Sequence, residues 1–91
     1  MTGLEHKDAS FILLSSPKLD DMISILYAKE YQVLPIKGYY QGQYEDSVMG
    51  YGRVDNDTLR NDVLFLLNHF QEECAIIKYT GETNAKKLFR D

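Results

Sequence analysis

Cysteine is nearly absent from this sequence, which contains Cys74 alone and no apolar run long enough to cross a membrane. A single cysteine cannot form an internal disulfide, and this usage is typical of a reducing cytoplasm. A bilayer span needs ~18 consecutive apolar residues, and a signal peptide needs a basic start followed by an apolar block. Because the sequence has neither, we expect a cytoplasmic protein that does not contact a membrane.

Basic charge is also scarce, since 10 lysines and arginines are outnumbered by 14 aspartates and glutamates, for a formal net charge of −4. Proteins that bind nucleic acid through its phosphates need a concentrated basic surface. Nucleic acid is therefore disfavoured as a partner, whereas a basic patch on another protein is allowed.

The chain of 91 residues is long enough for one hydrophobic core and too short for two. Its apolar share of 44% is ordinary for a folded protein. We expect a flexible arm at residues 1–9, a single domain at residues 10–80, and a C-terminal tail or short edge element at residues 81–91.

A strand and a helix are predicted first. Residues 11–14 are all apolar, which is typical of a strand buried on both faces. Ser15, Ser16 and Pro17 then have the residue types of a helix start. Apolar residues recur behind them at helical spacing, so we expect this helix to end near Glu30.

Two strands, a second helix and a last strand follow. Residues 31–36 contain a proline, which cannot donate to a ladder and so indicates an edge strand. Residues 38–42 are predicted to form the turn, and residues 44–54 to form the partner strand. Capping side chains at residues 55–58 indicate the start of the second helix, and residues 74–80 are predicted to form the last strand.

The order β-α-β-β-α-β matches the ferredoxin-like arrangement, an α+β two-layer sandwich. In this topology an antiparallel four-stranded sheet has the order 4-1-3-2, and two helices cover one face of the sheet while the other face stays open. The predicted core consists of inward-facing residues of the central strands and both helices: Phe11, Ile12, Leu13, Leu26, Val63, Leu66, Phe70 and Ile76.

Three short motifs carry a family resemblance: residues 33–38, which end in glycine, Glu45 and Ser47 at a strand start, and residues 70–72 (Phe-Gln-Glu) at a helix end. In these motifs the chain resembles an uncharacterised family of small α/β domains of bacteria and bacteriophages, over roughly residues 10–80. The family has no established activity, so the resemblance implies the fold. If a phage encodes the chain, the expected location is the host cytoplasm.

Tyrosine is concentrated between residues 31 and 52, which hold five of the seven tyrosines. Tyrosine supplies a large contact area with little rotamer entropy and is enriched at interfaces. The first interpretation is therefore a non-enzymatic protein-binding module of the kind phages make, in which Tyr39, Tyr40, Tyr44 and Tyr51 contact the partner. The partner is expected to be a host or defence protein, or a second copy of the chain, since a symmetry mate readily buries an open sheet face.

Glu45, Ser47 and Gln71 are the other candidate binding residues. A glutamate can act as a base and a serine as a nucleophile, but a hydrolase also needs a group that activates the serine. His6 lies in the predicted arm and His69 on the second helix, so neither supplies that group, and we expect no catalytic residue and no enzyme. The structural alternative is that Glu45 binds backbone donors and Gln71 caps the helix.

Two further functions stay open. The first is binding of a small-molecule or nucleotide-derived ligand in a cleft between the tyrosine-rich hairpin and Gln71. The second is single-stranded nucleic-acid binding, because Lys37, Gly38 and the following tyrosines partly match an RNA-recognition signature. The sequence has neither the close ligand spacings of a metal site nor a phosphate-binding loop, so we expect no metal and no cofactor.

Overall fold

The computed structural model describes residues 9–40, 42–52 and 54–90, with the backbone alone for residues 38–40 and 43–45. The element order along this part of the chain is β-α-β-β-α-β-β. The bounds are Ser10–Ser15 for β1, Leu19–Ala28 for α1, Gln32–Tyr40 for β2, Gln43–Gly52 for β3, Asn56–Phe70 for α2, Cys74–Lys78 for β4 and Lys86–Phe89 for β5.

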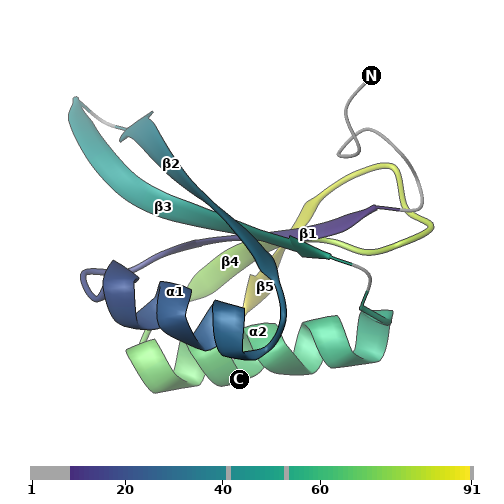
Figure 1. Cartoon of the computed structure of the whole chain (residues 1–91). Helices are drawn as coiled ribbons and strands as arrows, with labels where there is room; N and C mark the ends of the chain where they lie inside the picture. The colour runs from purple at the N-terminus through teal and green to yellow at the C-terminus, as the bar shows by residue number, and fades with distance from the viewer. Residues whose placement is uncertain (1–8, 41, 53, 91) are drawn as a thin grey trace.

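The strands form one antiparallel sheet with the order β2-β3-β1-β4-β5. Apart from β5, this is the predicted ferredoxin-like order, so the predicted α+β fold class is confirmed. The strand count differs from the prediction, because β5 adds a fifth strand beside β4. Both helices lie on one face of the sheet (Figure 1), and the other face is not covered by a helix.

The core lies between the sheet and the helices. In β1 the side chains of Ser10, Ile12 and Leu14 are buried, and those between them are half-buried. A Cβ atom at Gly50 would lie 3.3 Å from Ile12 and 3.4 Å from Leu26 of α1, so these strand positions face the helices. The buried apolar residues are Ile12, Leu14, Met22, Leu26, Tyr31, Val48, Leu59, Val63, Leu66, Leu67, Ala75 and Ile77.

The predicted core is partly wrong in its strands. Four of its residues are fully buried: Ile12, Leu26, Val63 and Leu66. The others are half-buried: Phe11, Leu13, Phe70 and Ile76. Successive side chains of a strand point to opposite faces, and the helices cover only one face of this sheet. The expectation that residues 11–14 are buried on both faces is therefore also wrong.

The first helix begins later than predicted. Ser15 ends β1, and Ser16 accepts a hydrogen bond from the backbone N–H of Lys18 at 3.1 Å, so this serine supports a turn before the helix. The second helix begins as predicted, because Asp55 is its N-cap and accepts from the backbone N–H of Thr58 at 3.0 Å. Hydrogen bonds from the Thr58 hydroxyl and then from its backbone lower the pKa of Asp55.

The two edges of the sheet are β2 and β5. Pro35 lies in β2, as predicted, at an edge where a missing N–H donor is tolerated. β5 is short and contains Lys86 and Lys87, and both features oppose edge-to-edge pairing with other chains. Within the described residues, no helix is long and apolar enough to cross a membrane.

Candidate functional site

The hairpin of β2 and β3 extends past the end of β1. β1 pairs with residues 47–52 of β3, whereas β2 pairs with residues 43–51 of β3. Residues 37–40 and 42–46, the overhang, therefore have no ladder partner in β1. Figure 1 shows the overhang leaving the body of the molecule on the side away from the helices. Gly42, with a φ of 81°, supplies the left-handed conformation that its tight turn requires.

The turn of this hairpin is shorter than the predicted turn at residues 38–42. Tyr39 and Tyr40 belong to β2, where their backbones pair with those of Tyr44 and Gln43. The side chains of the predicted binding residues Tyr39, Tyr40, Tyr44 and Glu45 lie outside the described part of the structure. Their contacts with a ligand or partner stay a prediction.

Two serines lie opposite each other where the overhang leaves the sheet. Ser15, the last residue of β1, is the register partner of Ser47 in β3, and their hydroxyl oxygens are 2.7 Å apart. Both residues are half-buried and lie on the face without helices. Ile36 of β2 is the partner of Ser47 on its other side. We call Ser15 and Ser47 the serine pair.

An apolar row crosses the same face next to the serine pair. The register places Leu34, Met49, Leu13 and Ile76 side by side across four strands. Leu34 is 48% exposed, and the other three residues are half-buried. Tyr51, which is 37% exposed, lies two residues beyond Met49 in β3. The apolar row and the two hydroxyl groups of the serine pair therefore lie next to each other on the open face.

Gln71 lies in the other layer of the molecule. It follows α2 with a φ of 57°, its amide nitrogen donates to the carbonyl of Asn68 at 2.7 Å, and its amide oxygen accepts from Arg90 at 3.3 Å. Figure 1 shows the end of α2 and the overhang on opposite sides of the sheet. The structure thus brings Ser47 and Tyr51 together on one face and does not bring Gln71 to them within one chain.

A polar cluster joins the segment between α1 and β2 to α2. The hydroxyl of Tyr31 donates to Asp62 at 2.8 Å, and Lys29 forms an ion pair with Asp62 at 3.2 Å. Burial of the phenol, and then its hydrogen bond to the carboxylate, raise the pKa of Tyr31 above its usual range. These groups satisfy one another in the helix layer, so we assign the cluster to the fold and not to a site.

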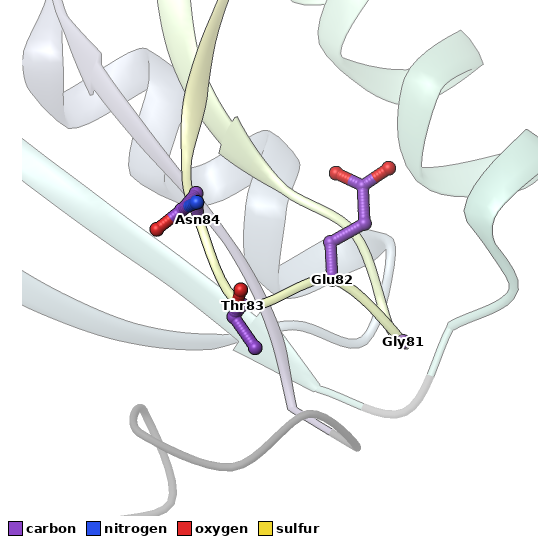
Figure 2. A pocket seen from close by; sticks show the side chains of 4 residues that line it. All are labelled: Gly81, Glu82, Thr83 and Asn84. Atoms are coloured by element: carbon purple, nitrogen blue, oxygen red, sulfur yellow. The ribbon is translucent and has the colours of Figure 1, made fainter.

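A hollow of about 460 Å³ lies on the turn between β4 and β5, lined by Gly81, Glu82, Thr83 and Asn84. Figure 2 shows the side chains of Glu82 and Thr83 leaving the turn in different directions. The Glu82 carboxylate pairs with Lys86 at 3.3 Å. Because its polar groups do not converge on a common point, this hollow lacks the arrangement of a ligand site.

Activating and metal-binding groups are missing from the open face as far as the structure describes it. His69 lies on α2 and stacks on Phe65 with ring centres 5.5 Å apart, so the sheet separates it from Ser47. Within the described ranges, no three histidine, cysteine, aspartate or glutamate side chains group so as to hold a metal ion. The serine pair therefore offers neutral hydroxyl groups for binding, and no described group would make Ser47 a nucleophile.

No family model matches this sequence, and no curated protein matches it either. Among solved structures, a phage SAM lyase in its apo state is similar to this chain, with a TM-score of 0.61 and 14% sequence identity. The similarity covers 91% of this chain and 89% of that one. These findings agree with the resemblance to an uncharacterised family of small bacteriophage domains, and the structural similarity shows a shared fold.

This match corrects the functional interpretation drawn from the sequence. The expectation of a non-enzymatic protein-binding module, and with it the expectation of no enzymatic activity, is overturned because a phage enzyme has this fold over nearly the same length. Composition and motif spacing did not indicate this, since a hairpin whose sequence is rich in tyrosine is compatible with a partner surface and with a substrate surface alike.

Sequence reasoning also missed Ser15 as a candidate site residue. It assigned Ser15 to the start of the first helix, whereas the residue ends β1 and bonds to Ser47. The signal lies in the pairing register of β1 and β3, in which the two serines are 32 residues apart along the chain. A single sequence does not contain that register.

Proposed function

We propose that this chain is an enzyme that cleaves S-adenosylmethionine (SAM) as a lyase. The similarity in fold to a phage SAM lyase, over nearly the full length of both chains, is the observation that carries the proposal. The open face beside the serine pair and the overhang is the proposed substrate surface, because it combines apolar area, hydroxyl groups and neighbouring aromatic residues.

The chemistry of such a cleavage suits a site without an activated nucleophile. SAM contains a sulfonium group, and when one of its carbon–sulfur bonds breaks, both electrons stay on sulfur, which leaves as a neutral thioether. A lyase adds no water, so the carbon gains its new bond within the substrate. Either the substrate's own carboxylate closes a ring on that carbon, or a neighbouring carbon gives a proton to a base such as the Glu45 carboxylate and its C–H electrons form a double bond. Both routes depend on positioning and on exclusion of water.

Each part of the proposed surface has a separate role. The apolar row supplies contact area for the adenine and the thioether, and the serine pair supplies hydrogen bonds to polar groups of the substrate. Tyr39, Tyr40, Tyr44, Tyr51 and Glu45 complete the proposed site, because aromatic faces and carboxylates stabilise a cation such as a sulfonium. The net charge of −4 favours the approach of a cationic substrate.

Self-association and location also belong to the proposal. A substrate on an open sheet face is in contact with water, so we propose that a second copy of the chain covers this face. The exposure of Leu34 and Tyr51 supports this, because apolar area on a sheet surface favours association. We place the enzyme in the cytoplasm, which the free thiol of Cys74 supports.

The proposal is tested by incubating the purified protein with SAM and identifying the products by liquid chromatography and mass spectrometry. We expect a thioether product and a second product whose masses add up to that of SAM. We expect Ser47→Ala to lower kcat/KM at least about tenfold, as loss of a hydrogen bond to the substrate predicts. Ser24→Ala serves as the matched control, because the Ser24 hydroxyl bonds the carbonyl of Asp20 on α1.

Two results would contradict the proposal. SAM that disappears no faster than in buffer would exclude the cleavage, provided that the protein is folded by circular dichroism. Products whose summed mass exceeds that of SAM by one water would show a hydrolase, and this would exclude a lyase.

A further inference from the structure

The serine pair has a defined capacity for hydrogen bonds. Each serine hydroxyl carries one hydrogen and two lone pairs. Because the Ser15 and Ser47 oxygens are 2.7 Å apart, one hydroxyl donates to the other. One hydrogen and three lone pairs of the pair therefore remain for other partners. The pair can donate once and can also accept.

The surroundings of the pair are apolar where the structure describes them. Ile36 lies opposite Ser47 across β2, Met49 follows it along β3, and Leu13 precedes Ser15 along β1. Lys37, the described cation of the overhang, lies 3.8 Å from Asp46 as an ion pair. At the serine pair a ligand therefore meets neutral hydroxyl groups, and the Lys37 charge nearby is already paired with Asp46.

A vicinal diol fits this arrangement better than an anion does. Each hydroxyl of a ribose diol both donates and accepts, which matches a pair that offers one hydrogen and several lone pairs. Residues two apart in a strand are about 6.7 Å apart, which is the spacing from Ser47 to Met49 of the apolar row. The distance from a ribose diol to its purine is comparable. The row then contacts the base while the serine pair contacts the sugar.

We infer that Ser15 is a positioning residue that holds the Ser47 hydroxyl toward the ribose diol of a nucleoside ligand. The inference rests on the proposed function in so far as SAM is a nucleoside derivative. Without Ser15, no neighbouring hydroxyl fixes the direction of the half-buried Ser47 hydroxyl. The directional hydrogen bond from Ser47 to the diol is then lost, while the apolar contact with the base remains. The protein then loses its preference for ribose over deoxyribose.

The test measures the dissociation constants of adenosine, 2′-deoxyadenosine and 3′-deoxyadenosine by isothermal titration calorimetry on the full chain. For the parent protein, we expect at least one deoxy analogue to bind about tenfold more weakly than adenosine, as loss of one well-placed hydrogen bond predicts. In Ser15→Ala, we expect the three nucleosides to bind within about twofold of one another. Ser15→Thr keeps a hydroxyl on a strand and should restore the preference, and Ser24→Ala should leave it unchanged.

The outcomes separate this inference from the proposed function. A parent that cleaves SAM while Ser15→Ala keeps the full preference for adenosine would overturn the inference and leave the lyase standing. If the parent does not cleave SAM but prefers adenosine, and Ser15→Ala has lost this preference, the result would support the inference and reject the lyase. A parent that binds no adenosine, or that binds the three nucleosides equally, would overturn the inference whatever its activity. A thermal unfolding curve of Ser15→Ala shows that the variant is folded at the temperature of the binding measurements.

Discussion

At the scale of single residues, Tyr31 shows how a polar group can join two layers of this fold. Its side chain is only 3% exposed, and its hydroxyl donates to Asp62 on α2 at 2.8 Å. Asp62 is also paired with Lys29, so the carboxylate keeps a partner if the phenol is lost. Neutral tyrosine suits this environment, because ionisation would place a second negative charge beside Asp62 in a buried position.

The variant Tyr31→Phe tests this account through pH. The folded state raises the pKa of Tyr31, so its contribution to stability is complete below the unfolded value of ~10 and is lost as the pH rises above that value. We expect Tyr31→Phe to lower the free energy of unfolding by about 1 kcal/mol at neutral pH. We also expect that, as the pH rises from about 9 to 11, the free energy of unfolding falls less in Tyr31→Phe than in the parent protein.

Urea unfolding across this pH range provides the measurement, and Tyr27→Phe is the control because Tyr27 is 59% exposed. If the two variants show the same stability and the same pH dependence, the role assigned to the Tyr31 hydroxyl is wrong.

At the scale of elements, the β2–β3 hairpin is divided into a part inside the sheet and the overhang. Residues 47–51 of β3 pair on both sides, whereas the overhang pairs only within the hairpin. Its described ion pair between Lys37 and Asp46 is 3.8 Å long and mostly exposed, so it adds little stability. A hairpin end that lacks a third strand beside it is free to serve the proposed site.

Replacing Tyr39 and Tyr40 together with serine should therefore separate activity from stability. We expect the double variant to lower kcat/KM for SAM more than about tenfold, because rings over a sulfonium stabilise its charge. The midpoint of thermal unfolding should change little, since the overhang has no partner in β1. Asp46→Asn, which removes only the exposed ion pair, is the control. A large loss of stability with unchanged kcat/KM in the folded fraction would assign these tyrosines to the fold.

The elements differ in how well a single sequence predicts them. Pro35 marks an edge strand and Asp55 a helix cap, because each acts through local backbone chemistry. The buried face of β1 is not predictable in this way, since an all-apolar run has no contrast between its two faces. The sequence left residues 81–91 as a tail or a short edge element, because the pairing that makes β5 an edge strand joins distant segments. The partnership of Ser15 with Ser47 depends on such pairing too, and local pattern does not contain that information.

At the scale of the whole molecule, the two faces of the sheet have different surroundings. Two helices cover one face (Figure 1), and the other presents the apolar row, in which Leu34 is 48% exposed. Phe65 on the helix layer is also 48% exposed. The two residues thus provide equally exposed apolar side chains on opposite layers, and they make a matched pair for locating a self-association surface.

We expect the protein to form a dimer or a larger assembly through the open face. Leu34→Glu should shift the molar mass measured by light scattering toward the monomer, because a charge buried between two copies lacks a partner. Phe65→Glu should leave the assembly intact. A parent that stays monomeric up to high micromolar concentration, or a Phe65→Glu variant that dissociates while Leu34→Glu does not, would contradict this arrangement.

The lyase proposal is tested most directly by proton nuclear magnetic resonance of SAM during incubation with the purified protein. The methyl group on the positively charged sulfur and the methyl group of a neutral thioether give separate signals, so one sample follows substrate and product together. The account predicts that the thioether methyl signal grows at an initial rate proportional to the protein concentration and well above the rate in buffer. A sulfonium signal that decays equally with and without folded protein would contradict it.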